Sequence, residues 1–78
     1  MNYKQIIDEI LLVAKRKQAT DPNGEYAVTI NSLNQHFSSK FPDLDKRSVS
    51  EVIDEIDARG WLLKRDTTKL IFDPATFK

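Results

Sequence analysis

Residues 45–60, DKRSVSEVIDEIDARG, decide how this chain is expected to fold. Their apolar residues recur every three or four positions, the spacing that places them on one face of an amphipathic helix. Asp45 stands where a helix N-cap is expected, and Gly60 stands where a left-handed residue ends a helix. The stretch therefore predicts a helix from Lys46 to Arg59. Its buried face consists of Val49, Val52, Ile53 and Ile56.

Two further helices and a short strand are expected upstream. Apolar residues at helical spacing predict a first helix over residues 2–18. Residues 21–24 have the composition of a tight turn, and residues 26–28 suit a short strand. Thr29 is expected to cap a second helix, which ends before Pro42 because the residue preceding proline avoids the α region. The apolar stripe of the first helix consists of Tyr3, Ile6, Ile7, Ile10, Val13 and Ala14.

The periodicity changes from helical to extended after the third helix. Residues 61–65 and 69–73 predict the two strands of a β-hairpin around a polar turn. One more helical turn is expected at Asp73-Pro74, with Phe77 packed against the core. The whole chain, residues 1–78, is expected to form a single α+β domain.

Composition and charge narrow the classes of protein to consider. With 78 residues the chain suits one domain with a thin core, and without cysteine it has neither disulfides nor thiolate metal sites. We expect no secretory leader, because the first residues have none of its features, and the longest apolar run, residues 10–14, is far below the about 20 residues that cross a bilayer. We therefore expect a cytoplasmic protein with no membrane span. Because the formal net charge is zero, any affinity for a polyanion depends on how the charges are arranged.

Catalytic chemistry has little support in the sequence. The only histidine, His36, lies beside the apolar face of the second helix and has no obvious acid partner in the sequence. Glu51 and Glu55 share a helix face, but without a neighbouring histidine they indicate no metal site. Gly24 and Gly60 both fall in turns, so no glycine-rich phosphate loop is present. We expect a protein that is not an enzyme and that holds neither metal nor cofactor.

The order helix, short strand, helix, turn, helix, hairpin resembles the winged helix-turn-helix family over residues 2–73. The resemblance rests on TINSLNQHF (29–37) as the second helix, DKRSVSEVIDEIDARGW (45–61) as the third, and LLKRDTTKLIF (62–72) as the wing. It implies three helices with a short strand and a C-terminal β-hairpin wing. In members that bind DNA, the third helix enters the major groove, the second helix meets phosphates, and the wing grips the adjacent groove.

Carried over position by position, the resemblance nominates residues for contacts with double-stranded DNA. The residues expected at base edges are Lys46, Arg47, Ser48 and Ser50. Those expected at phosphates near the second helix are Asn31 and Ser32. Those expected in the wing contacts are Lys64, Arg65, Thr67, Thr68 and Lys69. Lys40, just before the turn, adds a positive charge. The expected function is a small DNA-binding regulator of transcription or replication, of bacterial or phage type.

The charge of the third helix leaves an alternative open. Its outermost positions are Arg47, Glu51, Asp54 and Ala58, of which only the first is positive. A carboxylate among phosphates weakens binding unless it accepts from cytosine N4, and Glu51 also stands where it can pair with Arg47 on the helix surface. The alternative function is a protein-interaction module, and dimerisation is a further expectation of the resemblance. The candidate docking residues are Leu12, Glu51, Asp54 and Glu55.

Overall fold

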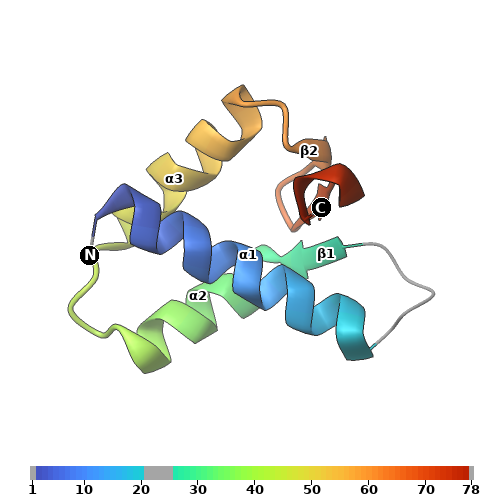
Figure 1. The fold of residues 1–78 in the computed structure, drawn as a ribbon. Helices are drawn as coiled ribbons and strands as arrows, with labels where there is room; N and C mark the ends of the chain where they lie inside the picture. Colours follow the sequence, from blue (N-terminus) through green and yellow to red (C-terminus); the bar gives the residue numbers. More distant parts are fainter. Residues whose placement is uncertain (1, 21–25, 78) are drawn as a thin grey trace.

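Three α-helices and one antiparallel sheet of three strands make up the described part of the chain, residues 2–20 and 26–77, in the computed structural model (Figure 1). The elements are α1 (Tyr3–Thr20), β1 (Tyr26–Thr29), α2 (Ile30–Lys40), α3 (Lys46–Ala58), β2 (Leu62–Arg65), β3 (Lys69–Phe72) and the 3₁₀ turn η1 (Pro74–Phe77). The expected α+β class and the expected order of elements are confirmed. The turn expected at residues 21–24 lies outside the described residues.

The sheet has the strand order β1-β3-β2 and is antiparallel throughout. Tyr26 in β1 lies opposite Phe72 in β3, so the first strand of the chain pairs with the last. A register shift between Leu62 and Lys64 interrupts the pairing of β2. Leu63 lies within this irregularity and its side chain is 62% exposed. The sequence predicted the hairpin but not the exposure of this leucine.

The starts of α2 and α3 are fixed by the two expected caps. The backbone N–H of Ser32 donates to Thr29 Oγ1 at 3.0 Å, and the N–H of Arg47 donates to Asp45 Oδ1 at 3.0 Å. Each side chain thereby satisfies one of the N–H groups that a helix start leaves without a partner. Both cap predictions are confirmed.

The end of α3 has the geometry that Gly60 predicted. Gly60 has φ +76°, a value that L residues with a Cβ adopt at a cost. Its N–H donates to the Asp57 carbonyl at 3.0 Å, and the N–H of Trp61 donates to the Ile56 carbonyl at 3.4 Å. These two hydrogen bonds form a Schellman motif, which satisfies carbonyls at the end of the helix and redirects the chain into β2.

The core lies where α1, α3 and the sheet meet. Its fully buried large side chains come from every helix and from the last strand: Ile6, Ile10, Leu33, Val52, Ile56, Leu70 and Phe72. Tyr3 was expected in the buried stripe, and this is wrong, because its side chain is 50% exposed. Its hydroxyl donates instead to Glu51 Oε2 at 2.7 Å, which ties the first turn of α1 to α3.

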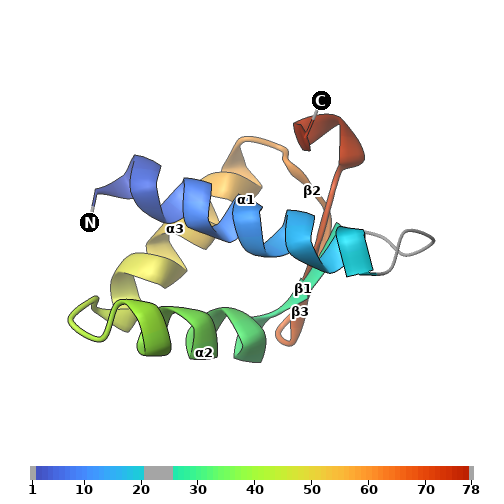
Figure 2. The same cartoon turned by 60° about the horizontal axis from the view of Figure 1, so that its bottom comes forward.

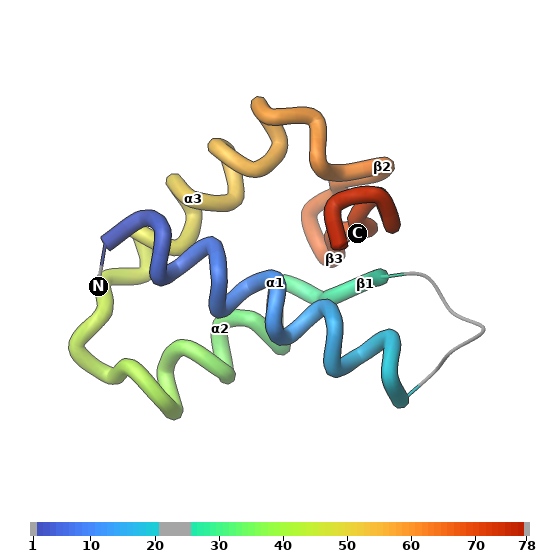
Figure 3. Tube along the Cα trace, viewed as in Figure 1, coloured from blue at the N-terminus to red at the C-terminus, as the bar shows by residue number. Residues whose placement is uncertain are grey.

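The ends of the sheet are joined to the helices by two further contacts. Figure 2 shows the tip of the β2–β3 hairpin beside the start of α2, where the N–H of Ile30 donates to the Thr68 carbonyl at 2.8 Å. After β3 the chain forms η1, the red turn in Figure 3, and the ring of Phe77 in η1 stacks on that of Tyr26 in β1 with centroids 4.3 Å apart. The expected packing of Phe77 is confirmed. The hairpin is therefore held at both its tip and its base.

Candidate functional site

Four of the residues expected to contact DNA line one hollow between α2, α3 and the hairpin tip. The hollow has a volume of about 330 Å³. Lys46 and Ser50 reach it from α3, one turn apart, while Arg65 and Thr67 reach it from the hairpin. Its remaining lining residues are Ile30, Asn34, Val49, Ile53 and Asp66. The fold thus brings together side chains from two segments that the sequence assigned separately to a helix and a wing.

The hairpin tip is organised by the carboxylate of Asp66. Asp66 Oδ1 accepts hydrogen bonds of 2.8 Å from the backbone N–H of Thr68, the hydroxyl of Thr68 and the backbone N–H of Lys69. These bonds, chiefly that from the Thr68 N–H, together with the charge of Lys64, lower the pKa of Asp66 to about 2. The carboxylate is therefore ionised at neutral pH and holds the turn in one shape. The sequence indicated only a polar turn here.

Arg65 does not extend freely from the hairpin. Its Nη2 lies 2.6 Å from Asp54 Oδ1 and its Nη1 lies 3.1 Å from Asp57 Oδ2. The hydrogen bond to Asp54 is the main reason that the pKa of Arg65 is raised. One guanidinium therefore bridges two exposed carboxylates that are three residues, or about one turn, apart on α3. The guanidinium thereby offsets part of the negative charge of α3, which is unfavourable for a contact with nucleic acid.

Four other nominated residues on α3 and the hairpin are not among the residues that line this hollow. Arg47 is exposed on the first turn of α3, and among the described residues no ion pair includes it. Ser48 is half-buried on the same turn, while Lys64 and Thr68 are exposed on the hairpin. The surface pair expected between Arg47 and Glu51 is absent from the described part of the chain, and Glu51 instead accepts from Tyr3.

The nominated residues of α2 and Lys69 lie in three other places. Ser32 and Lys69 line a second cavity, on the side of β1 that faces α1, and Asn31 is exposed on the first turn of α2. Lys40 lies at the far end of α2, where its Nζ is 3.7 Å from Glu9 Oε1. Lys40 therefore does not join the hollow beside the hairpin tip.

The histidine has an acid partner that the sequence did not reveal. His36 Nε2 lies 2.7 Å from Glu9 Oε1, and both side chains are largely buried between α1 and α2. Glu9 is 27 positions away along the chain, so only the packing of the two helices brings the groups together. Within residues 2–20 and 26–77, no three His, Cys, Asp or Glu side chains gather as metal ligands would.

The residues of the alternative docking surface lie on two different faces. Leu12 is 37% exposed on α1, beside hollows of about 340 Å³ and about 450 Å³ that share Asp8 and Leu11. The three nominated carboxylates of α3 each have a partner: Glu51 accepts from Tyr3, Asp54 binds Arg65, and Glu55 Oε1 lies 3.1 Å from Arg59 Nε. The acidic face is thus partly neutralised by neighbouring side chains.

Comparison with known proteins adds no relative. No family model matches the chain, and neither does any curated protein or any solved structure. None of the helices in the described ranges is long and apolar enough to cross a membrane.

Proposed function

We propose that this chain is a winged helix-turn-helix protein that binds double-stranded DNA, with the β2–β3 hairpin as the wing. The observation that carries the proposal is the hollow in which Lys46 and Ser50 of α3 face Arg65 and Thr67 of the hairpin. Cations and hydroxyls are the groups that contact phosphates and base edges. The strand order β1-β3-β2, which sets the wing beside the start of α2, supports the same interpretation.

The first turn of α3 is the part that would enter the groove. Lys46 and Arg47 are both exposed there, and the start of a helix carries partial positive charge that favours phosphate. A bidentate contact from Arg47 to guanine contributes about 1 to 3 kcal/mol of discrimination against other bases. The later turns of α3 stay outside the groove in this mode.

The bridge from Arg65 explains how an acidic helix is compatible with this proposal. Asp54 and Asp57 each have the guanidinium as a near counter-charge, so they repel phosphates less than two free carboxylates do. The same bridge occupies Arg65, which therefore contributes less to phosphate binding than a free arginine. We expect modest affinity that falls steeply with salt.

The test measures the fluorescence anisotropy of a labelled mixed-sequence duplex across a salt series. Lys46→Ala and Arg47→Ala should each weaken binding, and each should make the slope of log affinity against log salt less negative by about 0.9 per lost phosphate contact. Lys4→Ala, which removes one charge from the first turn of α1, is the matched control and should have little effect. Absence of binding at low salt, or equal effects of all three changes, would overturn the proposal.

A second candidate is a protein-interaction module, which the surface of α1 favours. Leu11 lines two hollows on this surface: the first also has Leu12 and Phe77 in its lining, and the second has Ile7 and Trp61. Sedimentation velocity over a range of protein concentration tests whether this surface joins two copies of the chain. Self-association that Leu12→Glu abolishes would favour the module, and a monomer at every concentration would count against pairing through this surface.

A further inference from the structure

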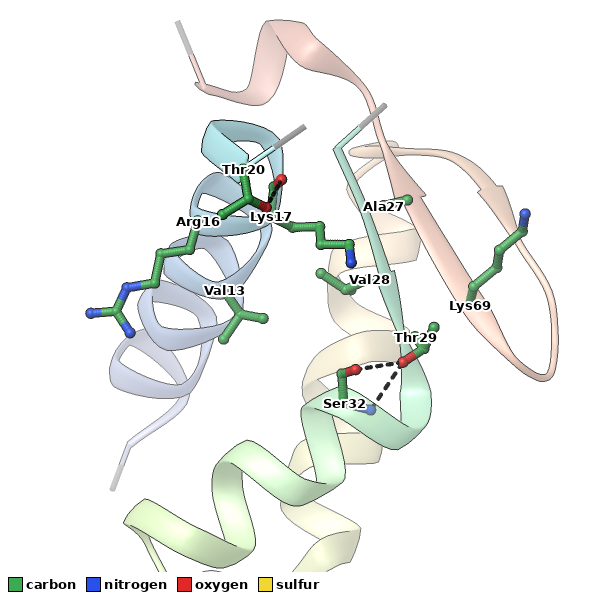
Figure 4. Close-up of a pocket in the computed structure, with 9 residues that line it drawn as sticks. All are labelled: Val13, Arg16, Lys17, Thr20, Ala27, Val28, Thr29, Ser32 and Lys69. Carbon is green, nitrogen blue, oxygen red and sulfur yellow. Dashed lines mark hydrogen bonds between the residues drawn. The ribbon is translucent and has the colours of Figure 1, made fainter. Parts of the chain in front are cut away.

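A cavity of about 350 Å³ lies between the C-terminal half of α1, strand β1 and the start of α2 (Figure 4). It is separate from the hollow beside the hairpin tip. Its floor is apolar and is formed by Val13, Ala27 and Val28. This volume falls in the range of pockets that bind small molecules, which combine an apolar lining with a few well-placed polar groups.

The rim of this cavity is positively charged. Arg16 and Lys17 line it from α1, and Lys69 lines it from β3. No described lining residue is acidic, and none of these three cations takes part in an ion pair within the described ranges. Figure 4 shows the Lys17 side chain extending from α1 toward Val28 in β1, while Arg16 turns outward. Lys69 extends away from α1 in the same view, so Lys17 is the one of these three cations that extends toward the apolar floor.

Two hydroxyl groups complete the polar side of the cavity. Thr29 Oγ1 accepts from the N–H of Ser32 at 3.0 Å and donates to Ser32 Oγ at 2.7 Å. Thr29 is the N-cap of α2 and Ser32 lies on its first turn, where the partial positive charge of the helix start adds to that of the cations. Ser32 Oγ retains a proton that it can donate to an acceptor in the cavity.

We propose that this cavity binds a small amphipathic anion, an aromatic or short aliphatic body bearing one phosphate, sulfonate or carboxylate group. The apolar floor would accommodate the body, and Lys17 with the Ser32 hydroxyl would bind the anionic group. An inorganic anion leaves the floor unused, and a neutral apolar molecule leaves the cations without a partner. Because the cavity has an apolar floor and a cationic side, it favours a molecule with an apolar body and an anionic group.

The experiment records ¹H–¹⁵N spectra of the labelled chain during titration with phenyl phosphate, with no DNA present. We expect saturable shifts of the amides of Val28, Thr29 and Ser32. Phenol and inorganic phosphate serve as the two half-ligands. Each should bind about tenfold or more weakly, because each lacks either the charge-assisted hydrogen bonds or the apolar contact.

Two variants on α1 then distinguish binding in this cavity from non-specific attraction of the anion to positive charge. Lys17→Ala should weaken phenyl phosphate about tenfold or more, since it removes a charge-assisted contact. Lys15→Ala removes the same charge from α1 but lines a different hollow, so it should leave the shifts unchanged. Both lysines are exposed, and the dispersion of each spectrum reports whether the variant is folded.

Equal binding of inorganic phosphate and phenyl phosphate, or equal effects of the two variants, would overturn the proposal. Because the assay contains no DNA, its outcome is independent of the proposed function.

Discussion

Arg65 in β2 donates a 2.6 Å hydrogen bond to Asp54, which lies eleven positions earlier in α3. The contact joins the hairpin to the exposed side of the helix, and it places a cation and a carboxylate from the two candidate surfaces in direct contact. The charge that this part of the molecule presents to a polyanion therefore depends in part on this pair. Changing one member of the pair alters the charge available to a partner.

Neutralising Asp54 should strengthen the binding of DNA. Asp54→Asn keeps the shape of the side chain but weakens its hold on Arg65, so the guanidinium gains freedom to contact a phosphate. We expect tighter binding at low salt and a log–log salt slope more negative by up to about 0.9. Asp8→Asn changes the net charge equally, on the surface of α1, and is the control in the same anisotropy assay. If the two variants bind alike, net charge alone governs affinity and the local explanation is wrong.

The stability of the hairpin tip should depend on pH through Asp66. Its pKa is about 2 in the folded chain and 3.8 for the ordinary group, so its stabilising effect is fully present above pH 3.8 and is lost as pH falls toward 2. Asp66→Asn keeps an accepting oxygen but no titratable group. Urea unfolding is followed by Trp61 fluorescence. Above pH 3.8 the free energy of unfolding should be larger for the wild type than for the variant, and this difference should decrease as the pH falls toward 2. A gap independent of pH would contradict this account.

Replacing Gly60 tests the backbone at the end of α3. Gly60→Ala should lower the free energy of unfolding by about 1 to 2 kcal/mol, because a Cβ is disfavoured at positive φ. Steric crowding does not add to this cost, since an added Cβ meets nothing within 4 Å. Gly60→Asn should be less costly, as asparagine tolerates this conformation better. Chemical denaturation measures both changes, and an alanine variant as stable as the wild type would show that the positive φ is not required.

The N-cap of α3 supplies a further stability prediction. Asp45→Ala should destabilise the fold by about 1 kcal/mol, because the N–H of Arg47 loses its acceptor. Asp45→Ser should restore most of this loss, since a serine hydroxyl caps equally well. Asp43→Ala removes an exposed carboxylate from the same loop and should change stability by less than about 0.5 kcal/mol. Equal losses for the Asp45→Ala and Asp43→Ala variants in urea titrations would rule out capping as the cause.

Local signals in the sequence were sufficient for the elements and their ends. Thr29, Asp45 and Gly60 each act on residues within one helical turn, so their positions in the sequence determine their roles. The buried face of α3 followed from helical periodicity for the same reason. The change to extended periodicity predicted the hairpin, but it did not predict the register shift around Leu63.

The contacts between elements could not be read from the sequence. Local spacing suggested that Glu51 would pair with Arg47, but Glu51 accepts from Tyr3, which is 48 positions away. Glu9 lies 27 positions from His36, and the bridge from Arg65 likewise joins separate elements. Such pairs depend on how helices and strands pack, which periodicity does not specify. The cavity that Val28 lines between α1, β1 and α2 could not be predicted for the same reason.

The hydrogen bond from the N–H of Ile30 to the Thr68 carbonyl has a mechanical consequence. This hydrogen bond joins the hairpin tip to the start of α2, and Arg65, at the end of β2 next to the tip, binds Asp54 and Asp57 of α3. Both contacts therefore oppose movement of the hairpin as an independent arm. A flexible partner that contacts both α3 and the hairpin must then adapt its own curvature to the relative position that these contacts favour. In a complex with a duplex, the distortion would then appear in the nucleic acid rather than in this chain.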